Sequence, residues 1–120
     1  MGLTYVTTKL VAVGASGGAY EAPFLVDTGA TDSMAPGDEL ERIGVAPVGR
    51  TAHELADGSL QEYNFGLVRI EFMGDVTAGR VIFGPEGCEP LLGVTALESV
   101  GILVDPANKT LKRLPAIPLK

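Results

Sequence analysis

Alternation of apolar and polar residues runs through most of the chain and predicts a mainly β protein. Residues 3–13 (LTYVTTKLVAV) and 19–27 (AYEAPFLVD) are extended runs on either side of a glycine-rich turn at 14–18. This arrangement is typical of a β-hairpin. Pro23 lies within the second run and predicts an edge position or a bulge, because proline cannot donate a backbone hydrogen bond to a neighbouring strand.

Two more hairpins are expected in the middle of the chain. Extended runs at 47–55 and 60–72 flank residues 56–59 (Ala-Asp-Gly-Ser), and an Asp-Gly pair in this position is a strong signal for a hairpin turn. A second turn at 73–75 connects the longer run to a further strand at 76–83. These three runs therefore predict antiparallel strands joined by short turns.

Two short helices are expected among the strands. Residues 34–45 place Pro36 in a first turn, acidic residues near the positive N-terminal end, and Gly44 just past the last turn. Residues 94–101 form a second, shorter candidate that Gly101 closes. The remaining short strands are expected at 90–93, at 102–105 and at 110–119, where two prolines cut the last strand short.

Size and composition favour one globular domain over residues 1–120. Hydrophobic residues make up 46% of the chain and charged residues 20%, and no linker or low-complexity tract divides it. Fifteen acidic against nine basic residues give a formal net charge of −6. Because no basic cluster interrupts this acidic balance, nucleic acid is not an expected partner.

The few special residues narrow the chemistry further. The chain has one cysteine and one histidine, which form no metal-ligand pattern, so neither a metal nor another cofactor is expected. Its first residues lack the basic start and long apolar run of a signal peptide, and no stretch reaches the length of a membrane span. A cytoplasmic location without a membrane partner is therefore expected.

The candidate chemistry begins where the predicted strand at 19–27 ends. This strand delivers a carboxylate, Asp27, into a Thr-Gly-Ala turn. A second apolar run ends in glycine in the same way and enters the second predicted helix. In chain order, the features are Asp27-Thr28-Gly29, the Asp57-Gly58 hairpin and Leu91-Leu92-Gly93.

This ordered set resembles the retropepsin-like aspartic proteases, which are the retroviral proteases and their small bacterial relatives. The resemblance extends from about residue 20 to about residue 115. It implies a closed β-barrel or sandwich with a flap hairpin and two short helices, assembled as a two-fold symmetric homodimer. Retroviral members usually carry an acidic residue and an arginine where this chain has Thr31 and Val94, and an apolar flap tip where it has Asp57. These departures favour a bacterial-type member.

The resemblance also implies a reaction. Two carboxylates about 3 Å apart cannot both ionise, so they share one proton and can act together as base and acid in peptide hydrolysis. Since the chain contains a single Asp-Thr-Gly, the second carboxylate has to come from an identical subunit. The expected function is an aspartic endopeptidase that acts as a homodimer, in which paired Asp27 side chains activate water and extended polypeptides are cleaved.

The neighbours of Asp27 receive their roles from the same resemblance. Thr28 would turn its hydroxyl toward the partner chain across the two-fold axis. Gly29 would let the backbone approach closely and offer its carbonyl to the substrate. The residues expected to contact the substrate are Ala30, Ala56, Asp57 and Gly58. The residues expected to support the catalytic loop from below are Leu91, Leu92 and Gly93.

Other interpretations of these residues stay open at this point. Asp27 could simply make a local turn, and His53 is expected to be a surface strand residue more readily than a catalytic base. Asp32 is expected on a solvated face of the first helix, together with Asp38 and nearby glutamates. At the level of function, the alternatives are a catalytically inactive retropepsin-fold module for dimerisation or peptide binding, and a monomeric β-barrel that binds a small ligand.

Overall fold

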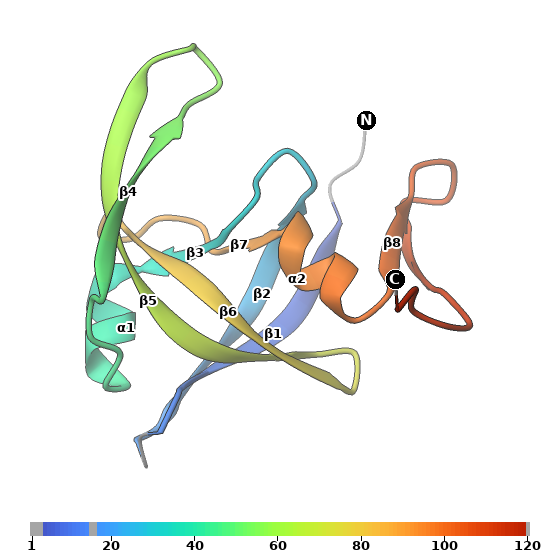
Figure 1. Ribbon diagram of the computed structural model, residues 1–120, viewed down its shortest axis with the longest axis horizontal. Helices are drawn as coiled ribbons and strands as arrows, with labels where there is room; N and C mark the ends of the chain where they lie inside the picture. Colours follow the sequence, from blue (N-terminus) through green and yellow to red (C-terminus); the bar gives the residue numbers. More distant parts are fainter. Residues whose placement is uncertain (1–3, 15–16, 120) are drawn as a thin grey trace.

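The structure of the chain, a computed structural model, describes residues 4–14 and 17–119 (Figure 1). The first residue of the strand predicted at 3–13 lies outside the described residues, as do residues 15 and 16 of the predicted turn. The β-strands are β1 (Tyr5–Ala12), β2 (Ala19–Asp27), β3 (Ser33–Pro36), β4 (Gly49–Glu54), β5 (Leu60–Phe72), β6 (Asp75–Gly84), β7 (Leu91–Gly93), β8 (Ile102–Asp105) and β9 (Thr110–Arg113). The helices are α1 (Gly37–Arg42) and α2 (Val94–Ser99).

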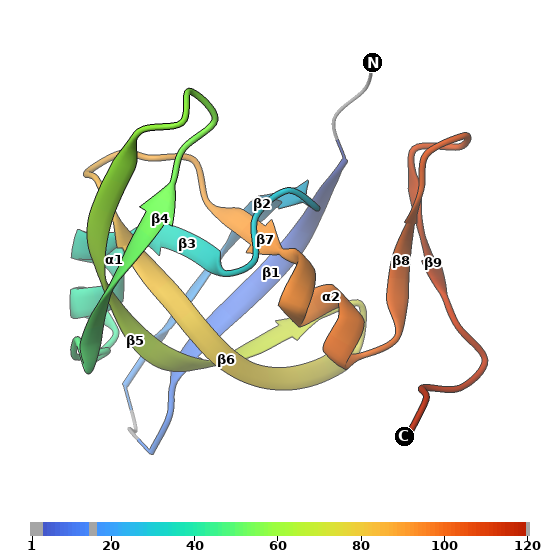
Figure 2. The ribbon, with the colours of Figure 1, turned by 45° about the horizontal axis from the view of Figure 1, so that its top comes forward.

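Six of the strands close into a barrel. They are bonded in the order β1-β2-β7-β3-β6-β5, and β5 pairs again with β1 to complete the ring. Strand β4 lies outside the ring on the free edge of β5, and β8 with β9 forms a separate two-stranded sheet. Figures 1 and 2 show these two additions on opposite sides of the barrel. The prediction of a mainly β, closed barrel with two short helices is therefore confirmed.

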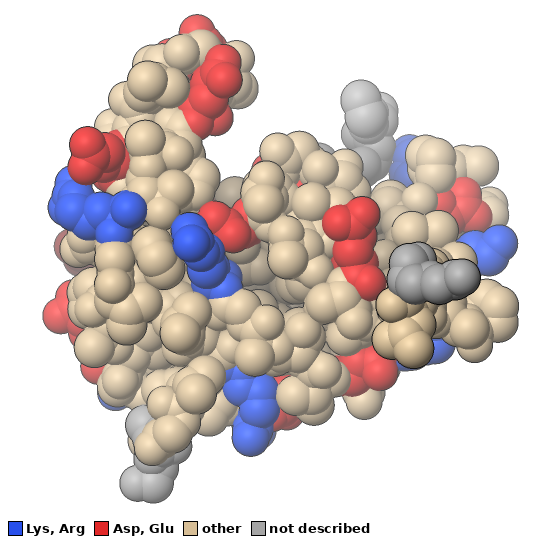
Figure 3. Space-filling model, in the orientation of Figure 1, with Lys and Arg blue, Asp and Glu red and all other residues tan. Residues whose placement is uncertain are grey.

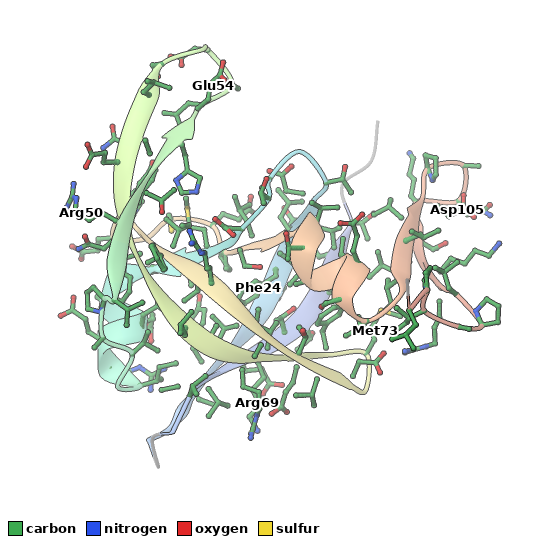
Figure 4. All side chains as sticks on the ribbon, viewed as in Figure 1. Phe24, Arg50, Glu54, Arg69, Met73 and Asp105 are labelled. Atoms are coloured by element: carbon green, nitrogen blue, oxygen red, sulfur yellow. The ribbon has the colours of Figure 1, made fainter. Side chains whose placement is uncertain are left out.

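The core lies inside the barrel and under the two helices. Leu10, Phe24 and Val68 have no exposed surface, and Figure 4 shows Phe24 between the strands. Leu40 of α1 and Leu97 of α2 close the ends of this core. Because successive side chains of a strand point to opposite faces, the alternating sequence pattern places one face of each strand in this core.

The structure corrects the predicted helix at 34–45. Residues 33–36 form β3 instead, which pairs in parallel with β6 and in antiparallel with β7 at Met34. The helix starts only at Gly37, because Pro36 still has an extended backbone with φ −57° and ψ 130°. The local signals correctly predicted a helix in this segment. Its first residues form a strand instead, because they fill the place between β6 and β7 in the ring.

Two predictions about prolines can be compared with the strand pairing. Pro23 pairs with Thr7 of β1 on one side, whereas β7 reaches β2 only from Leu25 to Asp27, so the predicted edge position is confirmed. The last strand ends at Arg113, before both prolines that follow it. Within the described residues, neither helix has the length and apolar character needed to cross a membrane.

Candidate active site

The two apolar-glycine motifs of the sequence meet in the barrel wall. Strands β2 and β7 run in parallel, and their register places Val26 beside Leu92 and Asp27 beside Gly93. Leu92 is fully buried under this pair of strands. The carboxylate at the end of β2 is therefore positioned by a second strand that lies far from it in the sequence.

The residues after Asp27 are held from one side by β7 and α2. We call residues 27–32 the Asp27 loop. Its carbonyls accept backbone N–H groups from the start of α2, at 2.8 Å from Val94 to Ala30 and 3.3 Å from Thr95 to Thr31. These backbone bonds therefore tie the Asp27 loop to the first residues of α2.

Gly93 is a position where a side chain would not fit. Its N–H donates to the buried hydroxyl of Ser33 at 3.0 Å. A Cβ atom at Gly93 would lie 2.6 Å from the carbonyl carbon of Asp32 and 2.7 Å from the carbonyl oxygen of Thr31. Because these neighbours are backbone atoms, the Asp27 loop can approach β7 this closely only over a glycine.

Asp27 itself is half-buried at the start of its loop. Its Oδ1 accepts the N–H of Gly29 at 3.0 Å, and its carbonyl accepts the N–H of Ala30 at 3.1 Å. The first bond is the local turn considered above as an alternative interpretation of Asp27. This bond fixes the orientation of the carboxylate. It does not prevent a catalytic role for Asp27, because the same side chain also lines a cavity.

This cavity has a volume of about 640 Å³ and separates the Asp27 loop from the hairpin of β4 and β5. Figure 3 shows the same side of the molecule as a notch between that hairpin and the barrel. The lining combines acidic and apolar groups with one imidazole. It consists of Asp27, Gly29, Ala30, Thr31, Asp32, Met34, Ala52, His53, Glu54, Leu55, Ala56, Tyr63, Ile82 and Leu91.

The structure brings some of the expected site residues to this cavity and leaves others outside it. Asp27, Gly29, Ala30 and Ala56 line it, and Leu91 of the supporting motif joins them. Three of the residues suggested for catalysis or substrate binding, Thr28, Asp57 and Gly58, are not part of the lining, and neither are Leu92 and Gly93 of the supporting motif. Thr28 instead lines a second groove, of about 350 Å³, together with residues of α2 and β8.

The hairpin that faces Asp27 extends well beyond the barrel. We call residues 49–64 the outer hairpin, since β4 pairs there with the part of β5 that precedes its pairing with β6. At the tip, Asp57 accepts the N–H and the hydroxyl of Ser59 at 2.9 and 2.6 Å, and these hydrogen bonds lower the pKa of the exposed Asp57 carboxyl. Figure 4 shows Glu54 near this tip, where Figure 3 shows acidic side chains.

One interpretation from the sequence was wrong, and another needs a finer description. His53 is a strand residue as expected, but its half-buried ring lines the cavity. Asp32 lies before β3 and not on α1, and its Oδ2 is 3.3 Å from Nε2 of His53. Tyr63, which the sequence did not mark as a binding residue, also lines the cavity. The one signal in the sequence for His53 was the alternation along β4, in which odd-numbered residues are the less exposed ones. No local pattern indicated that His53 would lie beside Asp32.

Comparisons with known proteins were made by sequence and by structure. No family model and no curated protein sequence matches the chain. The retroviral protease-like domain of Ddi1 from Leishmania major aligns with 96% of this chain and 92% of its own, at 18% identity and a TM-score of 0.55. A retropepsin-like aspartic protease from Rickettsia conorii aligns with 92% of this chain and 88% of its own, at 20% identity and a TM-score of 0.50.

Both structures are similar to this chain over nearly their whole length. The chain therefore has the fold of the retropepsin-like aspartic protease domains, as its sequence motifs predicted. At these identities the likeness concerns the fold, and the chemistry has to be argued from the residues of this chain.

Proposed function

We propose that the chain is an aspartic endopeptidase that acts as a homodimer on extended polypeptides. The observation that carries the proposal is the position of Asp27. Its carboxylate ends β2 within a retropepsin-like barrel and lines a cavity of about 640 Å³ beneath a projecting hairpin. Such a cavity is large enough for peptide side chains.

The reaction needs a second carboxylate close to the first. In the proposed dimer, the Asp27 side chains of two chains share one proton, and the apparent pKa values belong to the pair. The ionised member takes a proton from water, whose oxygen attacks the peptide carbonyl carbon, while the protonated member donates its proton to the carbonyl oxygen. Transfer of a proton to the amide nitrogen then allows the C–N bond to break and releases an amine and a carboxylic acid.

The surroundings of Thr28 support this assembly. Thr28 is exposed and lines the groove of about 350 Å³ on a different side of its loop from the Asp27 cavity. If the cavity holds substrate, the side of this groove stays free for a second chain, and Val94 and Leu103 provide apolar surface there. We assign to Thr28 a contact with the partner chain across the two-fold axis.

The remaining residues take roles in binding. An extended peptide would lie in the cavity as an added strand, with main-chain hydrogen bonds to Gly29 and side chains that alternate between pockets. Ala30 and Ala56 would contact it from the floor and the hairpin, and the tip at Asp57 and Gly58 would act as a flap. The supporting residues Leu91, Leu92 and Gly93 would hold the floor.

The central experiment compares wild type with Asp27→Asn and with the control Asp38→Asn. Asp38 is an exposed carboxylate in the first turn of α1 and lies outside the cavity lining. Wild type and the control are expected to cleave an unstructured polypeptide best at mildly acidic pH, as detected by mass spectrometry. Asp27→Asn should lose at least about 10³-fold in rate with an unchanged melting temperature. The reason is that the substitution replaces both carboxylates of the dimer by amides, which cannot share a proton in this way. Undiminished cleavage by Asp27→Asn contradicts the proposal.

A mixing experiment tests the dimer directly. When wild type and Asp27→Asn chains exchange freely at equal concentration, only about one quarter of the dimers carry two Asp27 side chains. Activity per total dimer should therefore fall to about one quarter of the wild-type value, by simple random pairing. A decrease to one half would indicate that each chain works alone, and a monomer in sedimentation at micromolar concentration would favour the ligand-binding barrel. Peptide binding without turnover at any pH would favour the inactive module.

A further inference from the structure

The pair formed by His53 and Asp32 connects two parts of the molecule that face each other across the cavity. His53 lies on β4, and Asp32 belongs to the Asp27 loop, 21 residues away in the sequence. Their side chains retain 26% and 17% of their exposure, so water screens the interaction only in part. This contact is the subject of the inference.

The outer hairpin has little else to hold it over the loop. At its base, Arg80 donates to the hydroxyl of Thr51 at 3.2 Å and places its guanidinium 4.1 Å from the centre of the Phe65 ring. Farther out, Leu55 and Ser59 bond to each other across the tip, and residues 54–62 are exposed. His53 thus makes its contact well beyond the base of the hairpin, next to the exposed tip.

The geometry also fixes which ring nitrogen carries a proton. Nε2 of His53 is 3.3 Å from the Asp32 carboxylate, whereas Nδ1 is buried without a hydrogen-bond partner among the described residues. In the neutral ring, the proton therefore lies on Nε2, which donates to Asp32. The ring is kept in place by an edge contact with Tyr63, whose ring centre is 6.0 Å away.

Among the described residues that line the cavity, Asp32 is the group within hydrogen-bonding distance of the His53 ring. Because the ring donates and the Asp32 carboxylate accepts, this one directed bond joins β4 to the Asp27 loop.

We propose that His53 is a positioning residue, whose bond to Asp32 holds the outer hairpin over the Asp27 loop and so keeps the cavity covered. Its part in peptide cleavage rests on the proposed function, whereas the bond itself does not.

Amide hydrogen exchange of the outer hairpin tests the inference without any substrate. His53→Phe keeps the ring contact with Tyr63 and loses the donor, so the protection of residues 51–62 should fall about two- to fivefold below that of wild type, in line with the modest strength of partly exposed pairs. His53→Gln keeps a donor near the position of Nε2, so it should retain most of the wild-type protection.

The barrel strands serve as the internal control, since β1 and β2 should keep their protection in both variants. Equal protection of the hairpin in wild type and His53→Phe overturns the inference. If the chain cleaves peptides, His53→Phe should raise KM about two- to fivefold with kcat within about twofold, and His53→Gln should restore most of the binding. Should wild type cleave nothing while its hairpin shows the expected exchange, the proposed function fails and the bond between His53 and Asp32 stands.

Discussion

The Asp27 loop and the outer hairpin face each other across one cavity but are built in opposite ways. The loop is bonded through its backbone to the start of α2 and packed against Gly93. The outer hairpin is bonded mainly to itself, and side chains such as Arg80 and His53 attach it to the barrel. Backbone contacts with rigid neighbours fix a position, whereas side-chain contacts can be released one at a time.

This difference is suited to the two tasks that a peptide-cleaving site requires. A carboxylate that must lie close to a second carboxylate across a symmetry axis has to be held in a rigid loop. A cover that must admit and release a chain needs to open locally, without unfolding the barrel. We therefore expect substitutions in the floor to affect the whole molecule and substitutions in the hairpin to act locally.

The largest effect is expected from Leu92→Ala. Leu92 is fully buried beneath the pairing of β2 with β7, so the shortened side chain leaves a cavity under the Asp27 loop. The free energy of unfolding should fall by about 2–5 kcal/mol. Chemical denaturation measures this change, with Leu67→Ala as a control, because Leu67 is 48% exposed on β5. A loss no greater than that of the control would show that the floor does not depend on Leu92.

Gly93→Ala should be the next most severe change. The added Cβ would overlap backbone atoms of Thr31 and Asp32, so the Asp27 loop has to move away from β7. A decrease of about 1–3 kcal/mol in the free energy of unfolding is expected, as for other overpacked sites. Gly79→Ala provides a matched control, since a Cβ atom at Gly79 meets nothing within 4 Å. Equal stability of the two variants would contradict the close contact between loop and strand.

Gly58→Ala should have a smaller and more local effect. Gly58 has a φ of +86° at the tip of the outer hairpin, a backbone conformation that costs alanine about 1 kcal/mol. Because the tip can open by itself, we expect faster amide exchange in residues 54–60 and little change in the melting temperature. A melting temperature lowered as much as by Gly93→Ala would mean that the hairpin and the barrel unfold as one unit.

The smallest effect is expected from Ser59→Ala. The pKa of Asp57 is lowered mainly by the Ser59 hydroxyl and further by the Ser59 N–H, so removing the hydroxyl should raise this pKa toward its ordinary value. A carboxyl whose pKa is lowered by folding stabilises the fold at pH values above the ordinary pKa of aspartate. This stabilisation is lost as the pH falls through the lowered pKa. Ser59→Ala should therefore lose part of the stabilisation that Asp57 provides above that range. NMR titration measures the change. Asp105, whose pKa is lowered by Asn108, should not shift.

Much of the fold could be predicted from local patterns. Local conformational preferences of a few neighbouring residues are enough to predict the Asp-Gly turn at 57–58, the glycine that follows α2 and the strands around them. The segment at 33–36 could not be predicted in this way, because it is a strand only through its pairing with β6 and β7. Likewise, the sequence singled out Asp27 but placed Asp32 on the first helix and gave no sign that Asp32 and His53 meet.

The sequence alone determined where the chain turns, which faces of its strands are apolar, and that one carboxylate follows a strand into a glycine turn. These features are local, since backbone conformation and side-chain alternation are set within a few residues. The tertiary structure decided that Gly93 lies beside Asp27, that residues 33–36 complete the ring and that His53 reaches Asp32. Each of these results requires strands distant in the sequence to pair, and the closure of the barrel around a common core selects that pairing.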